Sequence, residues 1–283
     1  MTINRHLLVP IFALQLVFLA SGTAMAQGDI HRVDFKNFTY LPMCAGGKAR
    51  RVTVTKGEYS KATQMSGYVD NFYFGVSDVT YGELNGDGAD EAVILTECNT
   101  GGTGNFSEGF IYTMQAGRPF LVTRIPGGDR AYGGLRSAKI AAGILTVDSN
   151  DVGEAGGACC PEYAVTATYR LRAGKLVKFG TAIRRELYPK RRLTFARGGS
   201  EMNFTEKLNA QDLKRYVVGA KAGQVLSVSA GTPGLSISLL DDAKVTEGEN
   251  GFSARLPKNG DYSFEIQNIA EKAIDVTVTV RIK

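Results

Sequence analysis

The chain of 283 residues contains no tryptophan and only two histidines, His6 and His31. We expect His6 to be removed with an N-terminal export signal, so a zinc site that needs several histidines is excluded. A Ser-His-Asp triad would require His31, but the sequence has no G-x-S-x-G motif, and His31 lies just before the first expected strand. The sequence therefore predicts that His31 is an exposed residue near the mature N-terminus.

The lack of tryptophan also argues against a carbohydrate-active enzyme, because tryptophan is the usual stacking platform for sugars and the twelve tyrosines replace it only in part. A glycosidase further needs two carboxylates facing the sugar. Six carboxylates lie near expected loops: Asp87, Asp90, Glu91, Glu97, Glu108 and Asp129. No nucleophile with a neighbouring base emerges from the residues, so we assign no catalytic and no cofactor-binding residue and expect a non-enzymatic protein.

The net charge is also small. The formal net charge is +5, and one of these positive charges, Arg5, lies in the expected export signal. So small an excess does not indicate nucleic-acid binding.

The first 26 residues have the pattern of a signal peptide. Arg5 supplies a positive start, residues 7–20 are largely apolar, and Ala24-Met25-Ala26 forms a small-x-small cleavage pattern before Gln27. The apolar run is shorter than the roughly 20 residues that span a bilayer, so we expect no membrane span after cleavage. The sequence thus predicts a periplasmic or secreted protein, and it leaves the oligomeric state open.

Four cysteines in an exported chain, Cys44, Cys98, Cys159 and Cys160, predict two disulfides. Zinc is a poor alternative, because there is no C-x-x-C pair and adjacent cysteines are awkward tetrahedral ligands. A bond between adjacent cysteines is strained, so we expect Cys44 and Cys98 each to pair with one of the other two, in either order. A long closed loop of this kind stabilises a fold by roughly 3–5 kcal/mol.

Alternating apolar and polar residues, joined by glycine-containing turns, predict antiparallel strands throughout the mature chain. In the first half, Phe110, Tyr112 and Met114 alternate before a turn at residues 115–118, and residues 165–171 alternate before Ala173-Gly174. Residues 70–80 are expected to hold a strand and a bend, residues 55–65 are ambiguous, and no long window has helical periodicity. The expected fold is mainly β, with an α+β arrangement left open for the first half.

The second half alternates more regularly and predicts a jelly-roll-like β-sandwich of some seven or eight strands in about ninety residues. The positions expected to face its core include Leu226, Val228, Ala230, Leu235, Ile237, Leu239, Tyr262, Phe264, Ile266 and alternate residues of 274–282. The chain is thereby divided into a signal peptide (1–26), a disulfide-stapled β-rich domain (28–186), a basic linker (187–192) and a β-sandwich (193–283).

Five basic residues and a proline mark the stretch around this linker, residues 184–192. The simpler interpretation is a solvent-exposed connection. The alternative is that these charges bind an anionic polymer of the cell envelope.

One loop has the composition of a calcium site. Oxygen-bearing side chains lie at Glu83, Asn85 and Asp87, Gly88 follows where such a loop turns sharply, and Glu91 lies beyond. Calcium takes six to eight oxygen ligands, which alternate side chains on a tight loop can supply. Glu83, Asn85, Asp87 and Glu91 are therefore the candidate calcium ligands, and the alternative is a glycine-rich turn that leads into a buried strand at residues 92–95.

This loop resembles the aspartate-rich calcium loop of FG-GAP repeats, the blade units of integrin-type propellers. It differs in having Glu83 where that pattern has aspartate, and in occurring once where a propeller needs several copies. The wider stretch, about residues 33–181, is similar to a group of exported bacterial proteins with one such loop in a disulfide-stapled β-rich domain.

A second resemblance covers about residues 193–283. Ala222-Gly223-Gln224 forms a turn, and much later the pattern Leu-Pro-x-x-Gly-Asp-Tyr ends at Asp261 and Tyr262. These motifs resemble the pre-peptidase C-terminal type of β-sandwich, and a similar sandwich is used by periplasmic inhibitors of g-type lysozyme. At the start of a strand, Asp261 and Tyr262 are expected to support the fold rather than contact a ligand.

These observations together favour an exported accessory protein that binds an envelope polymer or a protein ligand. The resemblance of the second half implies an alternative, inhibition of g-type lysozyme by a loop of the sandwich. A calcium-dependent hydrolase is a third hypothesis.

Overall fold

The computed structural model describes residues 28–44, 50–153, 157 and 159–283. Nearly all of this part consists of strands and tight turns, and its single helical element is the short 3₁₀ turn η1 (Ile30–Arg32). The prediction of a mainly β protein is confirmed, and the described residues contain no α-helix that would make the first half α+β. The signal peptide, residues 1–26, lies outside the described residues.

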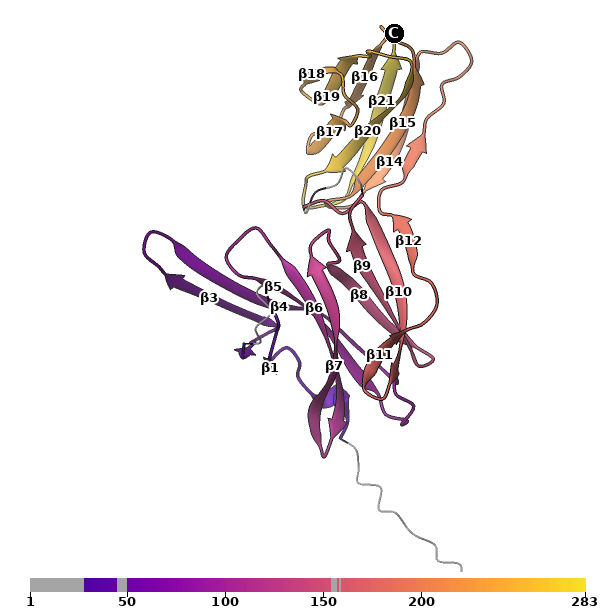
Figure 1. The fold of residues 1–283 in the computed structure, drawn as a ribbon. Helices are drawn as coiled ribbons and strands as arrows, with labels where there is room; N and C mark the ends of the chain where they lie inside the picture. Colours follow the sequence, from indigo (N-terminus) through magenta and orange to yellow (C-terminus); the bar gives the residue numbers. More distant parts are fainter. Residues whose placement is uncertain (1–27, 45–49, 154–156, 158) are drawn as a thin grey trace, which may run out of the picture.

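The first half of the described chain contains two five-stranded antiparallel sheets and a small two-stranded one (Figure 1). The small sheet pairs β1 (Thr39–Tyr40) with β2 (Val52–Thr53). The second sheet, in the order β3-β4-β5-β6-β7, consists of β3 (Glu58–Gln64), β4 (Val69–Gly82), β5 (Glu91–Asn99), β6 (Phe106–Gln115) and β7 (Arg118–Asp129). The third consists of β8 (Leu135–Ala141), β9 (Ile144–Asp151), β10 (Tyr163–Arg172), β11 (Lys175–Lys178) and β12 (Ile183–Glu186).

The central strand β5 is buried on both faces of its sheet. Ala92 and Ile94 belong to one apolar cluster, while Val93 and Leu95 belong to another on the opposite face. This explains why residues 92–95 form an unbroken apolar run, as predicted for a buried strand. The alternation of Phe110, Tyr112 and Met114 predicts that the opposite face of β6 is exposed to solvent, but Ile111 on that face is also fully buried.

The second half is a sandwich of two sheets (Figure 1). One sheet, in the order β13-β15-β20-β17, consists of β13 (Lys190–Arg192), β15 (Leu213–Ala220), β20 (Gly260–Asn268) and β17 (Leu235–Leu239). The other, in the order β14-β21-β16-β19-β18, consists of β14 (Glu201–Leu208), β21 (Ile274–Ile282), β16 (Val225–Ala230), β19 (Gly251–Arg255) and β18 (Lys244–Gly248). The positions predicted to face inward meet in one apolar cluster between the sheets, which includes Leu226, Val228, Tyr262, Phe264, Ile266, Val276, Val278 and Val280.

The basic stretch at residues 184–192 is divided between the two halves. Strand β12 pairs antiparallel with β10 of the first half, and β13 pairs parallel with β15 of the sandwich. The Leu187 N–H donates to the Glu162 carbonyl at 2.9 Å. Only residues 187–189 connect the two strands, so most of the stretch belongs to regular sheet structure.

The disulfide prediction is wrong in its pairing. Cys44 bonds Cys98 across 54 residues of sequence, and Cys159 bonds its neighbour Cys160. Cys44 follows β1 and meets Cys98 near the end of β5, and both are buried in the same apolar cluster. Cys159 and Cys160 lie instead in an exposed turn, where the Cys160 N–H donates to the Gly157 carbonyl at 3.0 Å. In the chain-entropy model the Cys44–Cys98 loop stabilises the fold by about 4 kcal/mol.

Candidate functional site

The predicted calcium loop connects the end of β4 to the start of β5. Gly86 and Gly88 have φ angles of 88° and 84°, in the left-handed region that glycine adopts without strain. These two residues let the loop fold back, so that Glu83 lies against the backbone of its own turn. The Glu83 carboxylate accepts hydrogen bonds from the N–H groups of Asn85 at 2.8 Å, Gly86 at 2.7 Å and Gly88.

The side chain of Asn85 lies at the centre of this loop. Its amide nitrogen donates to Asp87 Oδ2 at 3.1 Å and to Glu91 Oε1 at 2.6 Å, and its Oδ1 accepts from the Asp87 N–H at 2.8 Å. The Asp87 N–H thus fixes the orientation of the amide. The other oxygen of Glu91 accepts from the Leu84 N–H at 2.8 Å.

Glu91 is fully buried, which is unusual for a carboxyl group. Burial raises its pKa, the hydrogen bond from Leu84 opposes the shift, and the negative charges of Asp87 and Glu83 add to it. The amide donor of Asn85 stabilises the charged form in this setting.

As described, the four candidate ligands do not form a calcium cage. Both Glu83 oxygens accept backbone N–H groups, and Asn85 turns a donor rather than an oxygen toward Asp87 and Glu91. Among the described residues, no group of three or more His, Cys, Asp or Glu side chains is placed to hold a metal ion. The geometry fits a self-contained turn, and calcium binding stays a prediction.

The remaining loop carboxylates have separate partners. Asp90 lies 2.9 Å from Nε2 of His31, Glu97 accepts from Asn105 at 3.1 Å, and Asp129 pairs with Arg130 at 3.0 Å. The His31 side chain is half exposed and stacks on Tyr81, with ring centroids 4.3 Å apart. His31 is exposed as predicted, and in addition it links η1 to the calcium-like loop.

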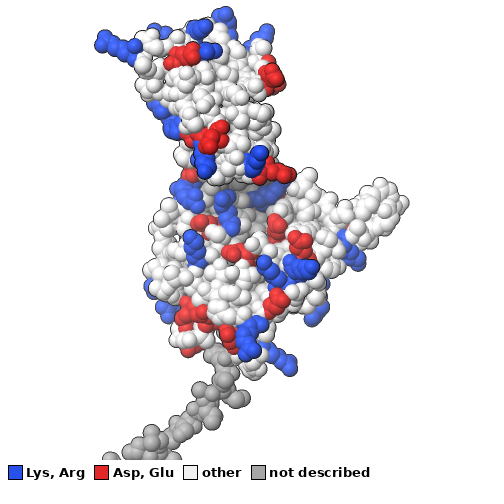
Figure 2. Space-filling view, turned by 180° about the vertical axis from the view of Figure 1, so that it is seen from behind, with Lys and Arg blue, Asp and Glu red and all other residues white. Residues whose placement is uncertain are grey.

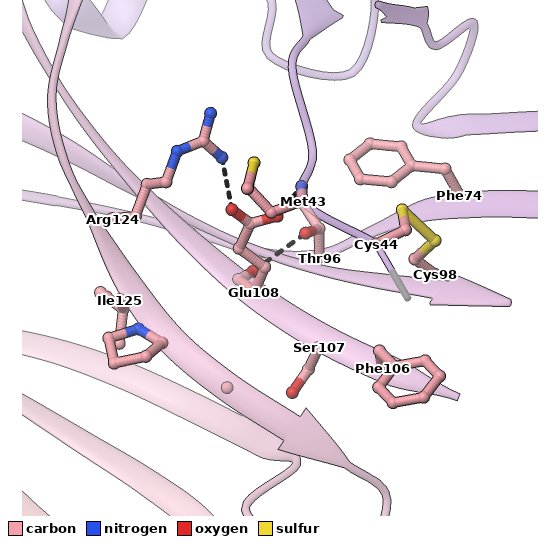
Figure 3. Close-up of a pocket in the computed structure, with 12 residues that line it drawn as sticks. Met43, Cys44, Phe74, Thr96, Cys98, Phe106, Ser107, Glu108, Arg124 and Ile125 are labelled. Carbon is pink, nitrogen blue, oxygen red and sulfur yellow. Dashed lines mark hydrogen bonds and ion pairs between the residues drawn. A yellow bond between two sulfur atoms is a disulfide. The ribbon is translucent and has the colours of Figure 1, made fainter. Parts of the chain in front are cut away.

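A pocket of about 400 Å³ lies beside the Cys44–Cys98 disulfide, between the segment before Cys44 and strands β4–β7 (Figure 3). Arg124 and Glu108 face each other on one wall, and the disulfide and Phe74 lie on the other. The lining residues are Met43, Cys44, Phe74, Thr96, Cys98, Phe106, Ser107, Glu108, Arg124, Ile125, Pro126 and Gly127.

The polar groups of this pocket already bind one another. Glu108 accepts from Arg124 and from the Met43 N–H at 2.8 Å, and Arg124 also donates to the Leu41 carbonyl at 2.6 Å. The Thr96 hydroxyl donates to the Glu108 carbonyl at 2.9 Å. These bonds attach residues 41–44 to the sheet, so the pocket's polar groups serve the fold.

Basic side chains gather at the waist between the two halves, with acidic side chains beside them (Figure 2). The four arginines of residues 184–192 each pair with a carboxylate: Arg184 with Asp151, Arg185 with Asp148, Arg191 with Glu206 and Arg192 with Asp261. Arg184 also lies 3.5 Å from the centre of the Tyr163 ring. This neutralisation favours the interpretation of the basic stretch as a structural connection over that of an anion-binding surface.

Three exposed apolar side chains lie close together in sequence at the tip of the β3–β4 hairpin. Strand β5 pairs with β4 only from Tyr73 onward, and Phe72 is buried in an apolar cluster, so residues 61–71 form a free two-stranded ribbon that projects from the sheet (Figure 1). Met65, Tyr68 and Val69 at its tip are 44%, 60% and 47% exposed, and residues 62–69 carry no charge. Such exposed apolar tips are typical of contact surfaces.

The sequence pattern does not predict this hairpin. Residues 55–65 were ambiguous because apolar residues are few there and do not alternate on a buried face. The turn is nevertheless well formed: the Met65 N–H donates to the Tyr68 carbonyl at 2.9 Å, and the Gln64 amide donates to the Met65 carbonyl at 3.2 Å. The available signal was Ser66-Gly67 between exposed apolar residues, a turn pattern without a core to face.

In the sandwich, the strand-start residues hold structural positions. The Tyr262 ring is buried, and its hydroxyl donates to the Lys258 carbonyl at 2.8 Å and accepts from the Lys258 N–H at 3.1 Å. Asp261 forms an exposed ion pair with Arg192 of β13, which lowers the pKa of this carboxyl. Tyr262 therefore fixes the loop before β20 in the way that the motif predicted.

Comparison with known proteins gives a limited likeness. No protein-family model and no curated protein matches the chain. Three solved structures of periplasmic inhibitors of g-type lysozyme, all named PliG, are similar to part of it. They are from Aeromonas hydrophila (17% identity, TM-score 0.29), Salmonella Typhimurium (19%, 0.29) and Escherichia coli (21%, 0.28). The matches cover 33–34% of this chain and 96–99% of the three inhibitors. No helix in the described part is long and apolar enough to cross a membrane.

Proposed function

We propose that this chain is an exported, non-enzymatic binding protein that recognises a protein of the cell envelope or its surroundings through the tip of the β3–β4 hairpin. The observation that carries the proposal is the free ribbon with Met65, Tyr68 and Val69 exposed at its uncharged end. Within the described part of the chain, these side chains stay 44–60% exposed.

The chemistry of the tip favours a protein over a charged polymer. Tyrosine and methionine are enriched at the centres of protein interfaces, where charged residues are depleted. An anionic polymer would need unpaired cations, whereas the four arginines of residues 184–192 each pair with a carboxylate. Strand β3 is in addition an edge strand, whose outer backbone groups could pair with an extended segment of the ligand.

The test compares capture of ligand from an envelope extract by the mature chain and by a tip variant, Met65→Ser/Tyr68→Ser/Val69→Thr. Because interface centres carry most of the binding energy, we expect the variant to recover at least about tenfold less ligand. Its melting temperature should match that of the parent chain, since the three side chains contribute to no buried cluster among the described residues.

The matched control is Ile183→Ser, which removes another exposed apolar side chain, 65% exposed on β12. This variant should capture ligand as the parent chain does. A photo-crosslinking residue at position 68 should form a covalent adduct with the same ligand. Equal recovery by the tip variant, or no adduct at position 68, would refute the proposal.

A second proposal is inhibition of g-type lysozyme. It is supported by the sequence resemblance of residues 193–283, whose motif residue Tyr262 takes the structural position that the resemblance implies. Inhibition would require a loop of the sandwich to enter the enzyme's cleft. Titration of a g-type lysozyme with purified mature chain should then abolish activity near one equivalent, whereas full activity at a large excess would remove this function.

A further inference from the structure

The Cys159–Cys160 disulfide differs from the Cys44–Cys98 disulfide in its access to solvent. Cys159 and Cys160 are both exposed, in the connection between β9 and β10, and neither belongs to an apolar cluster of the described residues. Cys44 and Cys98 are 7% and 4% exposed and lie inside a cluster. Thiol–disulfide exchange needs access of a thiolate to a sulfur, so an external thiol can reach the first bond far more easily than the second.

The two bonds also differ in how strongly folding protects them. The Cys44–Cys98 bond closes a loop of 54 residues, and its effect on the unfolded chain is correspondingly large. A bond between sequence neighbours closes almost no loop. The free energy by which a disulfide stabilises the fold is also the free energy by which folding stabilises that disulfide against reduction. Folding therefore keeps Cys44–Cys98 oxidised and gives Cys159–Cys160 little protection against reduction.

We propose that Cys159–Cys160 is a thiol–disulfide exchange site, which an external dithiol reduces while Cys44–Cys98 stays oxidised. One thiolate of the dithiol attacks a sulfur of the pair, the bond between Cys159 and Cys160 breaks, and a mixed disulfide forms. The released thiolate takes up a proton. The second thiol of the dithiol then attacks the dithiol's own sulfur in the mixed disulfide and releases the cysteine of this chain. Two thiols remain on this chain, the dithiol is oxidised to a disulfide, and two electrons have been transferred.

The site lies beside the connection between the two halves of the molecule. Cys160 precedes Glu162 by two residues. The Glu162 N–H donates to the Asp151 carbonyl at 3.2 Å, and the Glu162 carbonyl accepts from the Leu187 N–H at 2.9 Å. A partner joined to Cys159 or Cys160 by a mixed disulfide would therefore stand next to the start of β10 and the end of β12.

The experiment equilibrates the oxidised mature chain with graded ratios of reduced to oxidised dithiothreitol, without denaturant. Free thiols are then alkylated with N-ethylmaleimide and mapped by mass spectrometry after digestion. We expect Cys159 and Cys160 to be labelled together at ratios at least about tenfold lower than those that label Cys44 and Cys98. Circular dichroism of the half-reduced chain should match that of the oxidised chain.

Two double variants serve as controls. Cys159→Ala/Cys160→Ala should melt close to the parent chain and lose the easily reduced pair, whereas Cys44→Ala/Cys98→Ala should melt at a lower temperature and keep it. The proposal is overturned if both disulfides are reduced at the same ratio, if Cys159 and Cys160 are labelled only on unfolding, or if digestion links either of them to Cys44 or Cys98.

Discussion

Arg124 of β7 and Glu108 of β6 form a mostly buried ion pair that fastens the segment before Cys44 to the sheet. The same guanidinium donates to the Leu41 carbonyl, and the same carboxylate accepts from the Met43 N–H. One cross-strand pair thus supplies partners to two backbone groups of a segment that has little regular structure of its own. We expect this pair to control how firmly residues 41–44 close over the pocket.

Replacing Arg124 with methionine should therefore lower the free energy of unfolding by about 1–3 kcal/mol, because Glu108 keeps a buried charge with one partner fewer. Urea unfolding measures the change. Arg118→Met, at the exposed start of the same strand, is the control and should have little effect. Equal stability of the two variants would show that the pair makes no net contribution.

A second prediction concerns Asn268, which is fully buried at the end of β20. Its amide nitrogen donates to the carbonyls of Leu208, Asn209 and Lys272 at 3.2, 2.8 and 2.8 Å. Asn268→Asp keeps the size of the side chain but places an acceptor against three acceptors, so we expect a loss of about 2–4 kcal/mol in unfolding free energy. Asn203→Asp should be nearly neutral, because Asn203 is exposed and accepts a bond from Thr279 that aspartate can also accept.

The buried Glu91 predicts a particular pH dependence. Burial raises its pKa in the folded chain above the ordinary value of 4.5. The folded chain therefore holds this proton more tightly than the unfolded chain, and stability from this group falls as pH rises above 4.5 toward the folded pKa. Relative to Glu91→Gln, the parent chain should lose unfolding free energy as the pH rises above the ordinary value of 4.5, as measured by urea midpoints. Parallel curves for the two proteins would contradict the shift.

Calcium provides a test of the loop at residues 83–91. If its carboxylates keep the internal donors that they accept here, calcium and chelator will leave the melting temperature unchanged. A site filled at a hundred times its dissociation constant would instead stabilise the fold by about 2.7 kcal/mol. A rise with calcium but not with magnesium, lost in Asp87→Asn, would show that Asn85 turns its oxygen inward and that the original ligand prediction holds.

The sandwich was predictable from sequence because its central strands have one buried and one more exposed face. Val276, Val278 and Val280 alternate with exposed or half-exposed residues, and all three are buried between the sheets. The first half was harder, since β5 is covered on both faces and Ile111 is buried beside the alternating aromatic residues. Alternation cannot distinguish such strands, because both of their faces are apolar.

The disulfides could not be paired from sequence, since pairing depends on where the chain brings Cys44 in three dimensions. It lies against Cys98, with Cα atoms 6.1 Å apart, because η1 contacts β5 and Phe35 and Tyr40 pack in the same apolar cluster as residues of β5. The hairpin tip was missed for a related reason. Its apolar residues face outward, and the alternation of apolar and polar residues identifies a strand only where one face is buried.

The brief stretch at residues 187–189 sets a mechanical limit on the molecule. With β12 held by β10 and β13 held by β15, the Cα atoms of Glu186 and Lys190 can separate by no more than about 14 Å. The two β-rich halves are therefore held close together by a short connection. A ligand large enough to touch both would experience the second contact at a high effective concentration, gaining avidity that neither module offers when cut apart.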